Sequence, residues 1–174
     1  MKKTLLKAAS GIAVLCILFA AFLYFNNDIG IPAGKLKGDI LSSQKIVEGW
    51  MVDGSISDTM AAFISYPQDK ADHTYSVYVN RPGLSFGYFF RGGGNIAHVE
   101  KYIAEFTLEG YGERAFVSMN AQKVARLEID NGSGVRTIEI DSGKPFALVL
   151  SVNAGSICFY DVNGAAVEYL NHPL

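Results

Sequence analysis

Cysteine is scarce in this sequence, which contains Cys16 and Cys158 and no others in 174 residues. Cys16 lies in a long apolar run near the N-terminus, and Cys158 lies in an expected strand. If the apolar run is embedded in a membrane, these two residues cannot pair within one chain, and no disulfide framework exists. An apolar core must therefore hold the fold together, with Cys158 as a small buried side chain.

Positive charge is also scarce beyond the first seven residues. Of the 15 Lys and Arg, the three at Lys2, Lys3 and Lys7 precede the apolar run, which leaves 12 against 17 Asp and Glu and a formal charge of −5. This sign argues against nucleic acid as a partner and against electrostatic docking on an anionic bilayer.

The sequence lacks the residue groupings of common catalytic and metal sites. His73, His98 and His172 are scattered without ligand spacing, so we expect no metal and no cofactor. Gly83-Leu84-Ser85-Phe86-Gly87 matches the Gly-x-Ser-x-Gly pattern of a hydrolase, but that chemistry needs a helix after the serine, and a glycine-rich stretch follows here. We therefore expect no enzyme, and a surface serine hydrolase built on Ser85 is the third hypothesis.

The longest apolar run covers residues 8–25 and contains no charge. A helix rises about 1.5 Å per residue and the hydrocarbon layer is about 30 Å thick, so residues 5–25 can just span it. The preceding lysines favour a cytoplasmic N-terminus. We predict a cytoplasmic segment at residues 1–7, a transmembrane signal-anchor at residues 8–25, and a single-pass protein of the cell membrane whose C-terminal domain is extracytoplasmic.

Two other interpretations of the run remain open. A cleaved signal peptide usually has an apolar region of about 7 to 15 residues and a small-x-small cleavage site. The run is longer than that. A cleavage site that ends at Ala21 would need a small residue two positions earlier, where Phe19 stands. A lipoprotein would be modified at Cys16, but Leu15 precedes it where a small residue is expected. The uncleaved anchor is favoured over both.

Residues 26–43 contain closely spaced Gly, Asn and Pro with few apolar side chains, which is typical of a juxtamembrane linker. Residues 44–174 are then of a common size for one domain. Within them, Leu127 and Ile129 alternate with charged neighbours, the pattern of a half-buried strand, and Asp53-Gly54 is a typical turn pair. Strands are expected at residues 46–52, 60–66, 74–80, 84–90, 102–108, 125–130, 135–140, 146–152, 157–160 and 167–170.

These strands predict a mainly β fold, an antiparallel β-sandwich or open barrel preceded by one N-terminal transmembrane helix. Residues 59–64 and residues 96–108 also fit a helix, and the strand is favoured in both places. Gly92-Gly93-Gly94 is expected to close the strand before it as a hairpin or bulge.

Aromatic side chains are dense between residues 66 and 90. Neighbours in a strand face opposite ways, so Phe89 and the pair Tyr88 and Phe90 cannot all enter one core. Tyr88, Phe89, Phe90 and Arg91 are therefore the candidate ligand surface, either covered by another sheet or open to a glycan or a protein.

The architecture is similar to that of many small anchored proteins of bacteria. Our first hypothesis is an extracytoplasmic interaction or accessory domain, held to the membrane by its N-terminal helix, with a membrane protein or the cell wall as its partner. The second is a glycan- or cell-wall-binding module that uses the face formed by Tyr88, Phe89 and Phe90.

Overall fold

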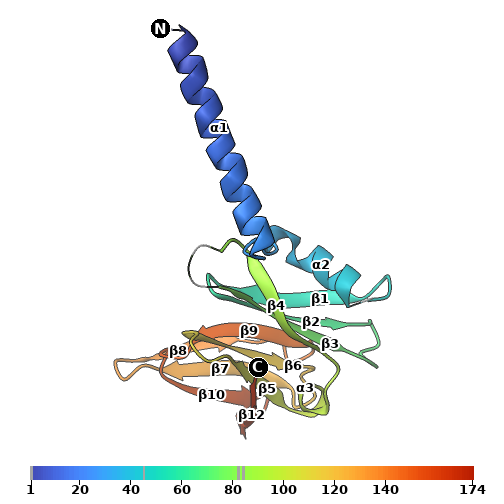
Figure 1. Ribbon diagram of the computed structural model, residues 1–174. Coiled ribbons are helices and arrows are strands. Elements are labelled where there is room, and N and C mark those ends of the chain that lie inside the picture. The colour runs from blue at the N-terminus through green and yellow to red at the C-terminus, as the bar shows by residue number, and fades with distance from the viewer. Residues whose placement is uncertain (1, 45, 82, 84) are drawn as a thin grey trace.

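The structure is a computed structural model that describes the backbone of residues 2–44, 46–81, 83 and 85–174, with side chains in these ranges from residue 10 onward. A long helix projects from a domain of stacked β-sheets (Figure 1). The predicted mainly β, sandwich-like fold is confirmed, with three open four-stranded sheets. We call them the near, middle and distal sheets, in order of their position from the helix.

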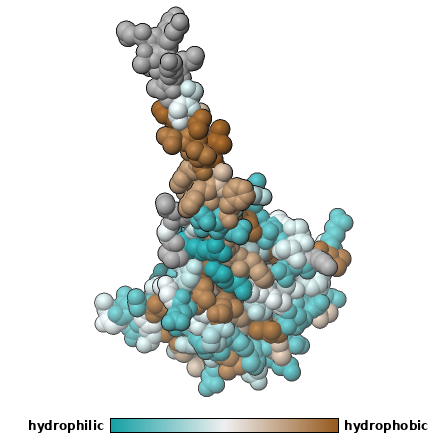
Figure 2. Space-filling model, in the orientation of Figure 1, coloured by the Kyte–Doolittle hydropathy of each residue, from teal (hydrophilic) through white to brown (hydrophobic). Residues whose placement is uncertain are grey.

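Helix α1 (Lys2–Phe25) carries the N-terminus away from the sheets (Figure 1). Its described side chains are mostly apolar and exposed, as Figure 2 shows, whereas Leu23 at its base is buried. In the part of the chain that the structure describes, no helix combines the length and the apolar character that a membrane crossing requires.

The near sheet has four antiparallel strands in the order β1-β2-β3-β4. They are β1 (Met51–Ile56), β2 (Met60–Tyr66), β3 (Thr74–Asn80) and β4 (Tyr88–Gly94). The second and third have the predicted bounds, so the helix considered for residues 59–64 is wrong. Every residue of β2 is buried, because both faces of this sheet are covered.

The middle sheet has the order β12-β5-β6-β9, and β12 pairs with β5 in parallel while the other pairs are antiparallel. Its strands are β5 (Ile103–Thr107), β6 (Glu113–Ser118), β9 (Phe146–Ser151) and β12 (Tyr169–Pro173). As predicted for residues 146–152, β9 is covered on both sides, with Ala147 packed toward the near sheet and Phe146 toward the distal sheet.

The segment that fitted both helix and strand contains one of each. Helix α3 (Ala97–Lys101) precedes β5 and places Val99 in the core. In β5, Ala104 and Phe106 then face the near sheet while Ile103 faces the distal sheet.

The distal sheet has the order β11-β10-β7-β8. Its strands are β7 (Val124–Asp130), β8 (Val135–Glu139), β10 (Ser156–Asp161) and β11 (Ala166–Val167). The predicted alternation in β7 is confirmed, because Leu127 and Ile129 are buried while Arg126 and Glu128 pair at 3.0 Å on the outer face. The last predicted hairpin is confirmed in part: β10 pairs with β11 at Val167, but Tyr169 and Leu170 of the strand expected at residues 167–170 belong to β12 in the middle sheet.

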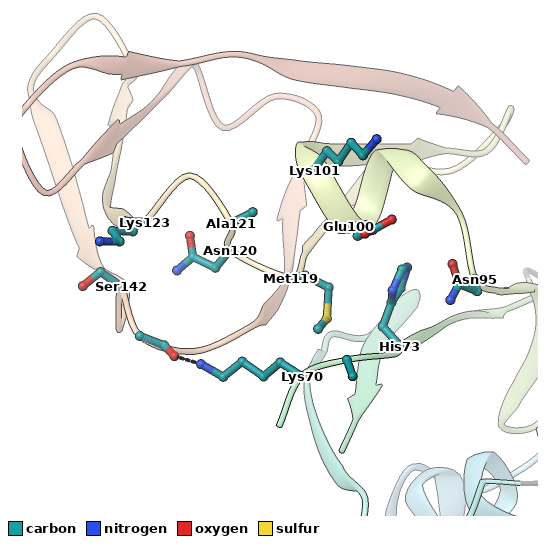
Figure 3. Close-up of a pocket in the computed structure, with 12 residues that line it drawn as sticks. Lys70, His73, Asn95, Glu100, Lys101, Met119, Asn120, Ala121, Lys123 and Ser142 are labelled. Atoms are coloured by element: carbon teal, nitrogen blue, oxygen red, sulfur yellow. Dashed lines mark hydrogen bonds between the residues drawn. The ribbon is translucent and has the colours of Figure 1, made fainter. Parts of the chain in front are cut away.

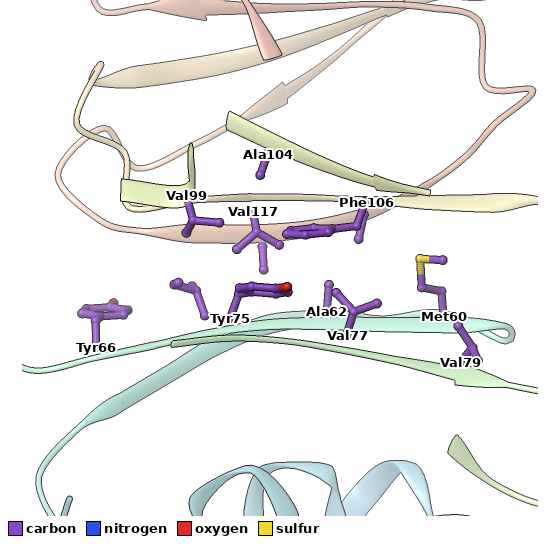
Figure 4. Close-up of a cluster of buried hydrophobic side chains, with 13 residues drawn as sticks. Met60, Ala62, Tyr66, Tyr75, Val77, Val79, Val99, Ala104, Phe106 and Val117 are labelled. Carbon is purple, nitrogen blue, oxygen red and sulfur yellow. The ribbon is translucent and has the colours of Figure 1, made fainter. Parts of the chain in front are cut away.

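Two apolar layers join the three sheets. Between the near and middle sheets, Tyr75 stacks on Phe106 with ring centroids 4.5 Å apart (Figure 4). Between the middle and distal sheets, the Phe116 ring lies 5.2 Å from the centroids of both Phe159 and Tyr169. Burial of these aromatic rings supplies the core that the scarcity of cysteine requires.

Residues 26–43 are more ordered than the linker that the sequence predicted. They form the 3-10 turn η1 (Ala33–Lys35) and helix α2 (Leu36–Ser43). Leu36 and Ile40, one helical turn apart, are fully buried against the outer face of the near sheet. The Tyr78 hydroxyl also donates a hydrogen bond to Asp39 Oδ2 at 2.8 Å, which ties α2 to β3.

The strand expected at residues 46–52 is wrong, because β1 begins at Met51 and runs through the expected turn Asp53-Gly54. A Cβ at Gly54 would lie 2.4 Å from the Phe63 ring and 2.3 Å from the carbonyl oxygen of Ala62. Glycine therefore serves close packing at this position rather than a turn.

Gly92-Gly93-Gly94 does not close the preceding strand, because β4 continues through it to Gly94. The register shifts between Val77 and Tyr78, which pair with Gly92 and Phe90, so the bulge lies at Arg91 and not at the three glycines. A Cβ at Gly93 would lie 2.8 Å from the carbonyl oxygen of Tyr75, so the glycine lets β4 pass close to β3. Leu84, at the expected start of this strand, lies outside the described residues.

Candidate functional site

A polar cleft of about 570 Å³ opens where four connections meet at one end of the sheets (Figure 3). The connection from β2 to β3 contributes Lys70 and His73, and α3 contributes Glu100 and Lys101. The connection from β6 to β7 contributes Asn120 and Lys123, and that from β8 to β9 contributes Ser142 and Gly143. Loops positioned by a sheet scaffold in this way commonly carry binding residues.

Asn120 fixes the shape of one wall of the cleft. It is buried and adopts a left-handed backbone conformation with φ of 58°. Its Oδ1 accepts a hydrogen bond from the Val124 N–H at 2.7 Å, and its Nδ2 donates to the carbonyl oxygen of Asp141 at 3.1 Å. Both connections on this side of the cleft are therefore held by one side chain.

His73 fixes the opposite wall and is also buried. Its Nε2–H donates to the carbonyl oxygen of Ile96 at 3.2 Å. Burial lowers the pKa of His73, although the Ile96 carbonyl and the nearby carboxylates of Asp72 and Glu100 act in the opposite direction. The ring is thus a neutral packing element at pH 7 that faces the cleft.

The cleft holds three lysines and one glutamate in a domain that is acidic as a whole. Lys70 donates a hydrogen bond to the carbonyl oxygen of Gly143, whereas Lys101 and Lys123 are exposed at the rim. Ammonium and amide donors of this kind suit a small polar or anionic ligand. Among the described lining residues, no nucleophile is hydrogen-bonded to a base.

The predicted ligand surface is divided between different environments. Tyr88 is buried at 7% exposure, its hydroxyl donates to the carbonyl oxygen of Ser57, and burial raises its pKa. Phe89 is half-buried, with the Arg81 guanidinium 3.9 Å from its ring centroid. Phe90 and Arg91 are exposed, and the Phe90 ring packs edge-on against Tyr78. The three rings therefore do not form one continuous exposed face.

Ser85 lies just before β4, and Leu84 in the same motif is outside the described residues. The Ser85 hydroxyl donates to the carbonyl oxygen of Arg81 at 2.8 Å. The segment after it enters strand β4 instead of the helix that a nucleophile elbow requires. His98 and His172, the two histidines downstream of Ser85, contact each other.

The contact between His98 and His172 was missed from the sequence. His98 Nδ1 and His172 Nε2 are in hydrogen-bond contact, and the ring centroids are 4.6 Å apart. Burial, and then the charge of His98, lower the pKa of His172. Their separation of 74 residues gives no spacing signal, because only the pairing of β12 beside β5 brings them together. Within the described residues, no group of three or more His, Cys, Asp and Glu could hold a metal ion.

No family model, curated protein or solved structure matches this chain. The molecule is thus defined by its own features, as a domain of three stacked β-sheets with a polar cleft at one end and a projecting apolar helix at its N-terminus.

Proposed function

We propose that this protein is a single-pass membrane protein whose residues 8–25 form the anchor and whose sheets form an extracytoplasmic interaction domain. The observation that carries the proposal is the exposed apolar surface of α1 (Figure 2). Its exposed large apolar side chains are Ile12, Val14, Leu15, Ile17, Leu18, Phe19, Phe22, Tyr24 and Phe25. An exposed apolar surface of this size marks a contact site, and a lipid bilayer is a non-aqueous neighbour that suits it.

The orientation rests on the charges beside the anchor. Lys2, Lys3 and Lys7 precede it, and lysine near a spanning segment favours the cytoplasmic side. The side chains of these residues lie outside the described part, so this step uses their positions in the sequence. The sheets then lie on the other side of the membrane.

The role as an interaction module is supported by the cleft at one end of the sheets. Its polar walls are held by Asn120 and His73, and Lys101 and Lys123 stand exposed at its rim. Ligand sites are usually preformed clefts in which a few placed polar or charged groups fix the orientation of the ligand. A partner or ligand with accessible anionic or polar groups fits this surface.

Membrane fractionation of the full chain tests the anchor. We expect the protein to stay with membranes after washing with alkaline carbonate, and added protease to reach its C-terminal domain in spheroplasts. The double substitution Leu15→Glu and Leu18→Glu should move it to the soluble fraction, because glutamate at the centre of a span is unfavourable. The matched control is Val135→Glu with Val162→Glu, two exposed domain positions, which should stay with the membranes. Carbonate release of the unmodified protein would overturn the proposal.

A further inference from the structure

The connection between α1 and the near sheet is hydrogen-bonded along its length. After the helix ends, the Asp28 N–H donates to the carbonyl oxygen of Leu23 at 2.9 Å. The Phe86 N–H then donates to Asp28 at 2.8 Å, and the Gly30 N–H donates back to Phe86 at 2.6 Å. Residues 28–31 therefore form an additional edge segment, which is paired through backbone hydrogen bonds with the residues that lead into β4.

Ile31 completes this edge with a reciprocal pair of bonds. The Ile31 N–H donates to the carbonyl oxygen of Tyr88, and the Tyr88 N–H donates to that of Ile31, both at 2.8 Å. The Arg81 guanidinium also donates to the carbonyl oxygen of Asn27 at 3.2 Å. The orientation of the domain relative to the base of α1 is thus set by backbone pairing.

Four large apolar side chains are exposed around this connection, and we call them the base patch: Tyr24, Phe25, Ile29 and Phe86. Phe25 is 82% exposed, and Ile29 and Phe86 are 54% and 55% exposed. Ile29 and Phe86 are direct partners in a parallel bridge, so their side chains point to the same side of the pairing. Two of the four residues belong to α1, and the other two continue its apolar surface onto the domain.

We propose that the base patch lies in the interfacial layer of the bilayer that holds α1, so that the domain rests against the membrane instead of extending from it on a flexible spacer. This inference rests on the proposed anchor. The occupant is lipid because the patch is continuous with the helix: α1 ends at Phe25, and the bridged residue Ile29 follows four positions later.

The chemistry of the patch fits this layer. Aromatic rings are favoured at the level of the lipid headgroups, where their edges stay close to water. The acidic character of the domain removes general electrostatic attraction to an anionic surface, so the contact must come from apolar and aromatic burial. Phe86 is the residue whose side chain should enter the lipid without belonging to the helix.

The test places the only tryptophan of the chain in the base patch. In a Trp50→Phe background, Phe86→Trp is compared with Val135→Trp, which is exposed on the distal sheet. The full chain is reconstituted in phosphatidylcholine vesicles with bromine on the acyl chains near the headgroup. We expect quenching at position 86 to be at least about twofold stronger than at position 135, with a blue-shifted emission, because an interfacial indole meets the quencher.

Co-sedimentation after a carbonate wash is measured on the same vesicles, which separates the two proposals. Release from the vesicles overturns the anchor itself. Retention with equal quenching at positions 86 and 135 leaves the anchor in place and overturns the base patch as a lipid contact. A blue-shifted but unquenched tryptophan at position 86 also overturns it, because protein, such as a second copy of the chain, then covers the patch instead of lipid. If Phe86→Trp does not fold by circular dichroism, Ile29→Trp takes its place with the same expectation.

Discussion

The near and distal sheets have the same number of strands but differ in how many faces are covered. The near sheet lies between α2 and the middle sheet, and every residue of β2 is buried. The distal sheet is covered on one face only, by the middle sheet. Its other face presents the Arg126–Glu128 pair and Tyr160 to solvent. Packing is therefore concentrated on the side of the domain where α1 is attached, and the opposite side has a polar surface.

The largest difference in stability between the two sheets is expected when an aromatic ring under α2 is truncated. Phe63 is 1% exposed, and Phe63→Ala should lower the free energy of unfolding by about 3 to 5 kcal/mol, because it leaves a cavity between α2 and the near sheet. Glu128→Ala on the outer face of the distal sheet should change it by less than about 0.5 kcal/mol. Urea unfolding of both variants measures the difference, and equal losses would contradict it.

A smaller effect on the free energy of unfolding, which depends on pH, tests the same comparison. Burial lowers the pKa of His73, beside the near sheet, below its ordinary value of 6.5, so the unfolded chain takes up more protons than the folded chain as the pH falls. Its contribution to stability is complete above about pH 6.5 and declines below it. The lowered pKa of His172 adds to this decline.

His73→Gln should flatten the loss of stability between about pH 7 and pH 5, because glutamine does not titrate there. Thermal unfolding across this range is the measurement. His98→Gln, which removes the charge that lowers the pKa of His172, measures the share of that histidine pair in the same decline. A decline as steep in His73→Gln as in the unmodified protein would show that this histidine does not carry it.

Local patterns in the sequence predicted much of the sheet structure. The strands at Met60–Tyr66 and Thr74–Asn80 have the predicted bounds, because apolar residues of high β propensity end there at polar turns. The alternation of Leu127 and Ile129 correctly identified one covered face. The sequence could not show that the sheets number three, since stacking depends on contacts between distant segments.

The errors occurred where tertiary packing overrides local preference. Gly54 is a turn residue by type, but it lies in a strand because the Phe63 ring occupies the space of a side chain. Helix α2 was missed because its apolar pair, Leu36 and Ile40, is surrounded by residues typical of linkers. Strand β6 was missed altogether.

The candidate site was the least predictable part of the molecule. The cleft is built from four connections that no sequence pattern relates, and its lysines are far apart in the chain. The aromatic residues chosen from the sequence were separated by the fold, because Tyr88 entered the cluster under α2 while Phe90 stayed exposed. The alternation of side chains along a strand predicted that neighbouring rings face opposite ways, but it did not predict which rings would be covered.

Amide hydrogen exchange at Gly30 and Ile31 tests most directly the claim that α1 and the near sheet form one ordered unit. Both N–H groups donate to backbone carbonyls beside β4, whereas the Ser133 N–H, in the exposed turn at residues 131–134 of the distal sheet, donates to the side-chain Oδ1 of Asn131 at 2.9 Å. In the full chain we expect Gly30 and Ile31 to exchange at least about tenfold more slowly, relative to their intrinsic rates, than Ser133. Exchange of Gly30 and Ile31 at the rates of an unstructured chain would show a flexible spacer and contradict the account.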